Sequence, residues 1–338
     1  MDYQKFNDKQ IIEDLSRFGD PAKIKVLYVS TYIPNYIRTE TILDIFRRNK
    51  IKFETIFTKD EKFRYLAAVF KTVSRLREFD VIFLAFRSQE VFPFFRLITR
   101  KPIIFDAFVS VYDTMCFDRK TFEPDSLPGK FFKQYDTYLC RQADLVLVDT
   151  KTHCQYFKKE FNAENVSYYY LECNNGLFRP IDSKENRDNF VVFWYGKGWP
   201  CQGADVILKA AEILKHETGI VFRLVGPIKE KYRNLVSQLD CRNIEFIEYL
   251  PYKRLPFEIA EADVCLGGHF SNIFKAKRVI AGKTFQFLAC KKKIILGDNS
   301  ANRELFSETS SINFVKMDSQ QELAKKILEI KNKRDVGA

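Results

Sequence analysis

The stretch "AGKTFQFLACKKKIILGDNSANREL" (residues 281–305) decides how this chain folds. It begins with the apolar periodicity of a helix (279–291), and "KIILGD" (293–298) is a short aliphatic run that is typical of a buried strand. The triplet Gly282-Lys283-Thr284 ends like a Walker A phosphate loop, but such a loop needs a glycine at position 277 and a strand before it. Position 277 is a lysine, and "FSNIFKAK" is not a strand core. The stretch therefore predicts a helix followed by a strand of an α/β fold, and not a phosphate loop.

Short apolar runs alternate with helical patterns on both sides of this stretch. In the first half, strands are predicted at 23–30, 52–57, 81–86, 103–109, 145–150 and 166–171. In the second half, strands are predicted at 190–196, 220–226, 244–249, 262–268, 293–298 and 312–316. Helical patterns lie between them, at 39–49 and 61–79, then at 203–217, 228–240, 255–261, 279–291 and 318–332. Continuous β-branched and aromatic runs between helices are typical of parallel sheets covered on both faces.

The two series of strands predict two domains. A polar segment with Gly, Pro and mixed charge separates them, so we expect a first domain at 1–175, a linker at 176–189 and a second domain at 190–320. The C-terminal helix, 321–338, is expected to pack back on the first domain. The predicted fold is α/β, with two doubly wound, Rossmann-like domains that face each other across a cleft. Neither series has GxGxxG after its first strand, which disfavours a nicotinamide- or flavin-dependent dehydrogenase.

The composition limits the possible functions. The chain has 338 residues, of which 46% are apolar, as expected of a globular protein. Its net charge of +11 suits a nucleic acid, an anionic membrane surface or a phosphorylated substrate as the partner. The eight cysteines form no CxxC pair, so reduced, scattered thiols are expected rather than zinc ligands or disulfides.

The sequence also bears on the compartment. The N-terminal residues carry acidic side chains throughout and lack the apolar core of a signal peptide. No apolar run approaches the length of about 18 residues that a membrane-spanning helix needs. We therefore expect a cytoplasmic protein.

Ligands of doubly wound sheets bind beyond the carboxyl ends of the strands, so residues that follow strands are candidates for a site. Gly196 and Lys197 lie before a helix whose N-terminus would favour a phosphate, although Lys197 could equally be a solvated loop lysine. Gly226 begins a turn after the next strand. Gly268 allows a ligand to approach the backbone, and His269 follows it as either a ligand contact or a structural histidine.

Two further candidates follow later strands. Lys283 opens a helix, where its side chain could reach an anion. Glu304 falls in the first turn of a helix that Asn299, Ser300 and Asn302 could cap. An acidic residue at that place also favours the helix dipole when no ligand is present, so a structural role for Glu304 stays open.

Four blocks of the second half resemble the donor-binding domain of GT-B glycosyltransferases, specifically the large retaining family 4. They are "YGKGWPCQGADVILKAAEIL", "FRLVG", "NIEFIEYLPYKRLPFEIAEADVCL" and "KTFQFLACKKKIILGDNSANREL", in the order and spacing of that family over 190–306. The resemblance implies that Lys197 is the cation that binds the donor diphosphate and that Lys283 is a second donor-site cation. The donor-binding residues that it implies are Gly196, Lys197, Gly226, Gly268, His269, Lys283, Thr284, Gln286 and Glu304.

The chain departs from this family at three positions. Gln202 stands where many members have a lysine before the first helix. Arg278 and Gln286 stand where many members have two glutamates, the second of which contacts the ribose. A glutamine can still form hydrogen bonds with ribose hydroxyls, but it carries no charge.

The first half resembles the acceptor domain of the same enzymes. "KIKVLYVSTYIPNY" resembles its opening strand and loop, without the usual glycine pair, and this implies that Ser30 and Tyr32 lie on the acceptor side. "PIIFDAFVSVYDT" resembles a segment of one branch and brings Asp106, Ser110 and Asp113 near the cleft. Asp106 interrupts an apolar strand, and because an unpaired buried carboxylate is costly, this favours a functional role.

The resemblance implies transfer of a sugar from a nucleotide diphosphate sugar to an acceptor hydroxyl by a retaining, hexosyltransferase-like enzyme. Lys197 and Lys283 would stabilise the departing diphosphate, and Asp106 or Asp113 would orient or deprotonate the acceptor. No DxD-like pair of carboxylates follows a strand in the donor half, so we expect no metal and no other obligatory cofactor.

The acceptor is expected to be a saccharide or a lipid-linked molecule of cell-surface glycan or glycolipid assembly. "RSQEVFPFFRLITRK" (87–101) and "FRYLAAVFKTVSRLR" (63–77) combine apolar and basic residues, which suits a peripheral position on the anionic inner face of a membrane. The alternative is that these helices pack on the sheet and expose basic faces.

Three other functions stay open. A nucleic-acid-binding protein would explain the charge, but no binding motif occurs and the charge is spread over both halves, so nucleic acid is not the expected partner. A non-catalytic sugar-nucleotide-binding protein would explain Arg278 and Gln286. A sugar-nucleotide epimerase of the GT-B type would share the same fold.

Overall fold

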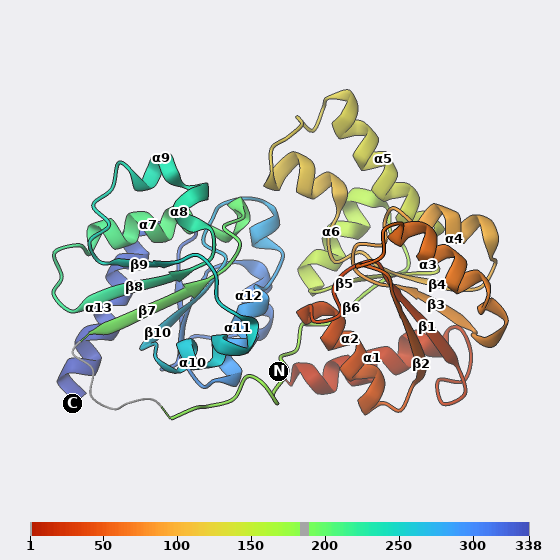
Figure 1. Cartoon of the computed structure of the whole chain (residues 1–338), viewed down its shortest axis with the longest axis horizontal. Coiled ribbons are helices and arrows are strands. Elements are labelled where there is room, and N and C mark those ends of the chain that lie inside the picture. Colours follow the sequence, from red (N-terminus) through yellow and green to blue (C-terminus); the bar gives the residue numbers. More distant parts are fainter. Residues whose placement is uncertain (1, 183–188, 338) are drawn as a thin grey trace. The chain divides into compact units, whose positions relative to one another are not determined.

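Two parallel sheets of six strands, one in each half of the chain, form the framework of the molecule (Figure 1). The computed structural model describes residues 2–182 and 189–337. The chain divides into two compact units between Glu172 and Cys173. The predicted class of two doubly wound α/β domains is therefore confirmed. Of the predicted linker, 176–189, residues 183–188 lie outside the described part of the chain.

The first sheet has the strand order β2-β1-β3-β4-β5-β6. Its strands are β1 (Lys25–Ser30), β2 (Lys52–Phe57), β3 (Val81–Leu84), β4 (Ile103–Asp106), β5 (Leu145–Val148) and β6 (Val166–Tyr168). Successive side chains of a strand point to opposite faces, so Leu27 and Val29 enter one hydrophobic core while Val26 and Tyr28 enter the other. Because both faces are covered, the inner strands β3 and β5 are apolar throughout, whereas the edge strand β2 carries the exposed Lys52 and Glu54.

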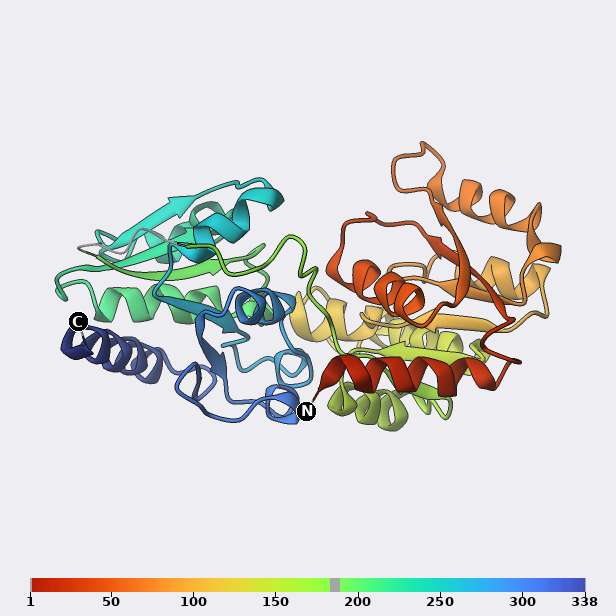
Figure 2. The ribbon, with the colours of Figure 1, turned by 90° about the horizontal axis from the view of Figure 1, so that it is seen from below.

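Helices cover both faces of this sheet. They are α1 (Tyr3–Ser16), α2 (Ile37–Arg48), α3 (Arg64–Val73), α4 (Phe92–Ile98), α5 (Leu127–Gln142) and α6 (Lys151–Phe161). Helices α3 to α6 share one core, and α1 and α2 share the other. Figure 2 looks onto the face that α1 covers. Helix α1 was not predicted from the sequence, because its buried Ile11 and Leu15 are few among polar residues.

The second sheet has the order β12-β11-β10-β7-β8-β9. Its strands are β7 (Phe190–Tyr195), β8 (Ile220–Val225), β9 (Ile244–Ile247), β10 (Val264–Gly268), β11 (Lys293–Gly297) and β12 (Ile312–Val315). The connections run from β7 to β9 toward one edge and from β10 to β12 toward the other. The order therefore reverses between β7 and β10, as in a doubly wound nucleotide-binding sheet.

The helices of the second unit are α7 (Ala204–Ile213), α8 (Ile228–Lys231), α9 (Arg233–Val236), α10 (Leu255–Ala260), α11 (Gly282–Ala289), α12 (Ser300–Leu305) and α13 (Gln320–Gly337). The C-terminal helix α13 packs against α7 (Figure 1). Its Leu323, Ala324 and Ile327 are buried in the core of the second unit. The helix therefore belongs to the second unit, and the expectation that it packs on the first unit is corrected, because its apolar side is already covered there.

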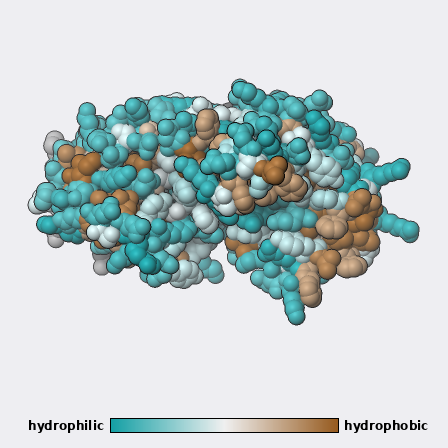
Figure 3. Space-filling model, turned by 90° about the horizontal axis from the view of Figure 1, so that it is seen from above, coloured by the Kyte–Doolittle hydropathy of each residue, from teal (hydrophilic) through white to brown (hydrophobic). Residues whose placement is uncertain are grey.

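Two predicted helices are interrupted. The pattern at 61–79 forms α3 and then a short 3₁₀ turn at Leu76–Glu78, and the pattern at 228–240 forms α8 and α9. None of the helices in the described part of the chain has the length and apolar character needed to cross a membrane. Hydrophilic residues cover most of the face shown in Figure 3, with apolar side chains gathered in patches.

Candidate functional site

Four of the predicted donor-binding residues lie at the carboxyl ends of the two strands where the second sheet reverses its order. Gly196 and Lys197 follow β7, whereas Gly268 ends β10 and His269 comes directly after it. Since β7 and β10 are neighbours, the loops that follow them meet at one edge of the sheet. Ligands of doubly wound sheets bind at this switch point.

Lys283 is a buried lysine in the first turn of α11. Its Nζ donates a hydrogen bond to the carbonyl oxygen of Tyr195 at 2.8 Å and lies 4.0 Å from the centre of the Trp194 ring. Burial lowers the pKa of the Lys283 amine well below its ordinary value. One acceptor and the rings of Trp194 and Tyr195 compensate only part of the cost of desolvating an ammonium group with three donors. An anionic ligand at this edge would supply the missing counter-charge.

His269 is a neutral side chain at the same edge. Burial, together with Lys283 and Lys275, lowers the pKa of His269 to about 3. Among the described residues, its Nδ1 has no hydrogen-bond partner. A neutral imidazole offers one donor and one acceptor, so His269 can form a hydrogen bond with a ligand at any pH near neutrality.

The loops of this edge approach each other so closely that two positions require glycine. Gly226 has φ +125°, and a Cβ there would lie 1.9 Å from the carbonyl oxygen of Gly196. Gly203 has φ +72°, and a Cβ there would lie 2.6 Å from the backbone nitrogen of Ser271. The loop after β8 is therefore fixed against the loop after β7, and the start of α7 is fixed against the loop after β10.

Lys197 is exposed, and a second lysine lies beside it. Lys231 of α8 donates from Nζ to the carbonyl oxygen of Lys197 at 2.5 Å and lies 3.8 Å from the centre of the Trp199 ring. Lys231 was not predicted as a site residue, because "IKEK" has the pattern of an ordinary helix surface. Two lysines thus meet at the loop after β7.

Gln286 is buried between two tyrosines. Its Oε1 accepts a hydrogen bond from the Tyr195 hydroxyl, and its Nε2 donates to the Tyr252 hydroxyl at 2.9 Å. Both ends of the amide are engaged within the second unit. Binding of a ribose by Gln286 would therefore require one of these hydrogen bonds to be replaced.

Thr284 and Glu304 complete the predicted donor-binding set. Thr284 is buried against β10, since a Cβ at Gly267 would lie 2.9 Å from its Oγ1. Glu304 lies half-buried near the C-terminal end of α12, and the expectation that it falls in the first turn is wrong, because the helix runs only from Ser300 to Leu305. Asn302, on the same helix, donates from Nδ2 to the carbonyl oxygen of Gly268 at 3.4 Å. Helix α12 therefore helps to hold the loop that carries His269.

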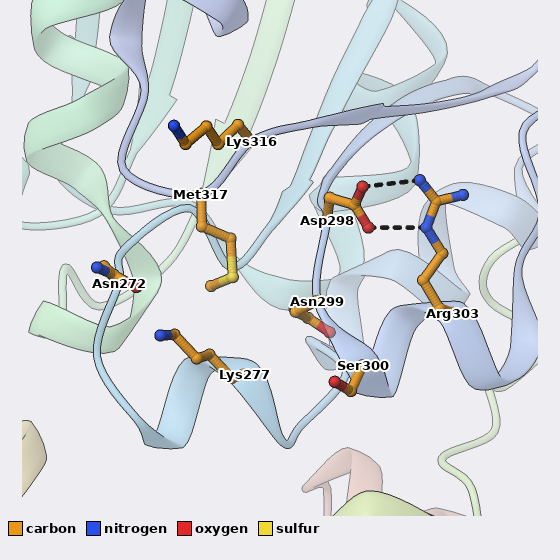
Figure 4. Close-up of a pocket in the computed structure, with 8 residues that line it drawn as sticks. All are labelled: Asn272, Lys277, Asp298, Asn299, Ser300, Arg303, Lys316 and Met317. Atoms are coloured by element: carbon orange, nitrogen blue, oxygen red, sulfur yellow. Dashed lines mark hydrogen bonds and ion pairs between the residues drawn. The ribbon is translucent and has the colours of Figure 1, made fainter.

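A polar recess of about 570 Å³ lies at the carboxyl ends of β11 and β12 (Figure 4). It is lined by Asn272, Lys277, Asp298, Asn299, Ser300, Arg303, Lys316 and Met317. Arg303 forms two hydrogen bonds with Asp298, at 2.7 and 2.8 Å, while Lys277 and Lys316 enter from two other segments. The sequence analysis did not identify this recess, because its cations come from segments that are distant in the sequence. The lining suits an anionic ligand.

In the first unit, Asp106 ends β4 and forms a fully buried ion pair with Arg38 of α2. Arg38 Nε lies 3.1 Å from both carboxylate oxygens, and its terminal nitrogens donate to the carbonyl oxygens of Val148 and Tyr169. Burial acts to lower the pKa of Arg38, but the Asp106 carboxylate outweighs this effect and raises the pKa above its ordinary value. Asp106 therefore ties α2 to the sheet. The sequence analysis missed Arg38, because an arginine in a helical segment is usually exposed.

Ser110 and Asp113 follow β4 in a loop that Asp136 of α5 holds. Ser110 Oγ donates to Asp136 Oδ2 at 2.6 Å and accepts from the backbone N–H of Asp113 at 2.9 Å. The backbone N–H of Tyr112 donates to the same Asp136 oxygen at 2.9 Å. Burial raises the pKa of Asp136 to about 6. Asp113 is buried at the start of a π-helical turn, Asp113–Asp118.

Ser30 ends β1, and Tyr32, in the loop that follows, belongs to a cluster of aromatic rings. Ser30 Oγ accepts from the backbone N–H of Tyr32 at 3.2 Å. The Tyr32 ring meets Tyr36 and Phe86 edge-on, with centroids 5.4 and 5.3 Å apart, and Phe86 meets Phe108 at 5.3 Å. The structure therefore brings the loops after β1, β3 and β4 together at the carboxyl edge of the first sheet. The sequence analysis did not identify Tyr36, Phe86 and Phe108 as parts of this edge.

In the described part of the chain, no three His, Cys, Asp or Glu side chains are placed so that they could hold a metal ion.

Comparisons with known proteins bear on the fold and on the second unit. The sequence profile of a family described as glycosyl transferase-like matches residues 206–336. No curated protein matches the chain in sequence. The structure is similar to HepE from Anabaena, solved in complex with UDP and glucose, with a TM-score of 0.65 and 15% identity over 92% of this chain and 91% of HepE.

Two other solved structures show the same likeness. Sucrose-phosphate synthase from Thermosynechococcus elongatus has a TM-score of 0.71 and 13% identity over 92% of this chain and 90% of its own. A glycosyltransferase from Rickettsia africae has a TM-score of 0.59 and 14% identity over 92% of this chain and 88% of its own. Likeness at this level of identity shows the fold, and it confirms the predicted GT-B class.

Proposed function

We propose that this chain is a glycosyltransferase that moves a sugar from a nucleotide diphosphate sugar to an acceptor hydroxyl. The observation that carries the proposal is Lys283, a buried amine without a counter-charge among its described contacts at the switch point of the second sheet. The match of residues 206–336 to a glycosyl transferase-like profile supports the same conclusion. So does the fold shared with HepE, which was solved with UDP and glucose.

In this proposal the second unit binds the donor. The leaving nucleoside diphosphate gains negative charge as the glycosidic bond breaks, and preorganised positive groups stabilise that charge. Lys283 would supply one cation from inside the unit, and Lys197 with its neighbour Lys231 would supply others from the loop after β7. His269 would donate or accept one hydrogen bond at the sugar. No metal or other obligatory cofactor is needed for these roles, and we propose that the anomeric configuration is retained.

The first unit would bind the acceptor at the edge formed by Ser30, Tyr32 and Ser110. Aromatic rings there offer apolar faces that can pack against a sugar ring. Asp113 is our candidate for the group that orients or deprotonates the acceptor hydroxyl. Asp106 would act through Arg38, as a positioning residue, because both of its oxygens are engaged.

The acceptor that we propose is a saccharide or a lipid-linked saccharide of cell-surface glycan or glycolipid assembly. The transfer would then take place in the cytoplasm, at the inner face of a membrane. The basic, apolar segments of the first unit support this location.

The donor site can be tested by a thermal-shift panel of UDP, GDP, ADP and CMP with their common sugars. We expect one diphosphate to raise the melting temperature of the wild type through mass action. Lys283→Ala should lose that shift, whereas Lys209→Ala, at a lysine of α7 whose side chain is 44% exposed, should keep it. A well-folded wild type that responds to none of these nucleotides would overturn the donor-site assignment.

One observation favours a second candidate, a protein that binds nucleotide sugars without turnover. Gln286 occupies the position of a family glutamate, and its amide is engaged by Tyr195 and Tyr252. Incubation with the nucleotide sugar identified by the panel separates the possibilities. Release of the nucleoside diphosphate in the presence of an acceptor indicates transfer, a change in the sugar alone indicates an epimerase, and binding without either change indicates a non-catalytic role.

A further inference from the structure

One side of helix α3 in the first unit exposes a stripe of large apolar residues. Phe63, Leu66, Phe70 and Val73 are spaced by three or four positions, so they lie along the same side of the helix. Phe70 is 71% exposed. The other side of the helix faces the core, where Ala68 is completely buried. The stripe is therefore additional to the apolar residues that fold this unit.

The neighbouring helix α4 continues the stripe. Its Phe94, Leu97 and Ile98 are exposed, and Leu97 reaches 83% exposure. Helices α3 and α4 contact each other, so the two sets of exposed side chains lie on neighbouring elements of the first unit. In Figure 3, apolar side chains gather at the lower right of the first unit, over the region of these helices. We call these seven residues, Phe63, Leu66, Phe70, Val73, Phe94, Leu97 and Ile98, the apolar face.

The segment that carries the apolar face is rich in basic residues. Residues 59–101 contain ten lysines and arginines but only five aspartates and glutamates, so this segment carries a large part of the net charge of +11. The ammonium of Lys62 lies 5.6 Å from the Phe63 ring centre, and the Arg64 guanidinium lies 4.6 Å from that of Tyr65. Long basic side chains can lie along apolar surface while their charges stay in water.

We propose that the apolar face binds a membrane surface that contains anionic lipids. Apolar side chains on helices that lie in the interfacial plane enter the boundary between headgroups and acyl chains, and the cations of the same segment are attracted to anionic headgroups. A second copy of the chain fits this surface less well. An isologous contact would place two segments of the same net positive charge against each other, which is repulsive.

This inference rests on the membrane location given in the proposed function and names the surface that would make the contact. Its failure can be distinguished from failure of the proposed reaction, because membrane binding is measured without donor or acceptor. The test is flotation of the full chain with vesicles of phosphatidylcholine that contain about a third phosphatidylglycerol, and with vesicles of phosphatidylcholine alone. We expect the wild type to float with the anionic vesicles, to bind the neutral vesicles much more weakly, and to be released by high salt, which screens the headgroup charge.

Variants of the apolar face separate this contact from general electrostatic attraction. Phe70→Glu with Leu97→Glu should lower the partition coefficient by about tenfold or more, because two apolar side chains are removed and two negative charges are introduced. Phe257→Glu, on an exposed position of α10 in the second unit, is the matched control and should bind like the wild type. Phe70→Trp should keep binding and should show a blue shift of its emission only with anionic vesicles.

Three outcomes would overturn the proposal. The first is a folded wild type that does not float with anionic vesicles. The second is equal binding by the double variant, which would assign any attraction to net charge alone. The third is a concentration-dependent dimer in light scattering that Phe70→Glu disrupts, which would show that a second copy covers the face.

Discussion

The Lys283 amine is buried, and in the ligand-free protein its described contacts include no negatively charged group. Near neutral pH the unfolded chain binds a proton at this amine more tightly than the folded protein does, because burial lowers the folded-state pKa. The free energy of unfolding should therefore rise as pH increases toward the ordinary lysine pKa. Lys283→Met removes the buried amine, and we expect it to stabilise the ligand-free protein by about 1–3 kcal/mol near neutral pH. The difference in unfolding free energy between Lys283→Met and the wild type should become smaller as pH rises.

Urea unfolding of the wild type, Lys283→Met and Lys209→Met over a series of pH values measures this effect. The side chain of Lys209 on α7 is 44% exposed, so its replacement should change neither the stability nor its pH dependence by more than about 0.5 kcal/mol. If Lys283→Met is less stable than the wild type at every pH, the amine is charged and stabilised by its surroundings in the folded protein. The prediction that Lys283 lacks a counter-charge until an anion binds would then be wrong.

Substitutions in the ion pair of Arg38 and Asp106 should lower the stability, unlike Lys283→Met, because each of these two buried charges has a counter-charge. Arg38→Met leaves the Asp106 carboxylate buried without a counter-charge and should cost about 3–5 kcal/mol of unfolding free energy. Asp106→Asn should cost a similar amount, because the guanidinium is then unpaired. The double variant should cost less than the sum of the two, which a double-mutant cycle in urea measures. Additive losses would show that the two side chains are stabilised independently.

At the level of the elements, Asp136 links helix α5 to the loop after β4. Its folded pKa of about 6 lies above the ordinary value of 3.8, so the folded protein holds this proton more tightly than the unfolded chain. The associated stability is fully present below about pH 4 and is lost as pH rises through about 6. Asp136→Asn cannot lose a proton, but its amide oxygen can still accept the hydrogen bonds from Ser110 and Tyr112. We therefore expect the unfolding free energy of the variant, relative to that of the wild type, to increase by up to about 3 kcal/mol between pH ~4 and pH ~8.

The measurement is the difference in unfolding free energy between Asp136→Asn and the wild type at several pH values. Glu164→Gln, at an exposed position, serves as the control for a carboxyl group outside this network. A difference that does not change with pH would mean that Asp136 does not titrate in this range. The loop carries Ser110 and Asp113, so the same variant also reports whether activity depends on the way α5 holds that loop.

At the scale of the whole molecule, the order of apolar runs was enough to predict both sheets. Each inner strand pairs in parallel with a strand on either side, so it must be apolar on both faces, and that pattern is visible in one sequence. Contacts between side chains from distant segments could not be predicted from the sequence. Arg38 has the sequence context of a surface arginine, and its pairing with Asp106 follows from how α2 crosses the sheet. The engagement of Gln286 by Tyr195 and Tyr252 likewise depends on three separate segments.

The second unit should also fold and bind the donor nucleotide without the first unit. The chain divides between Glu172 and Cys173, and the second unit has its own core, which α13 completes with Leu323 and Ile327. Lys283 and His269 have their described contacts within this unit. We therefore expect residues 173–338, expressed alone, to unfold cooperatively and to bind the same nucleoside diphosphate as the full chain, with affinity within about tenfold because the acceptor side is absent. Calorimetry of both proteins with the nucleotide measures this. A folded second unit that does not bind, beside a full chain that does, would show that the first unit contributes part of the donor site.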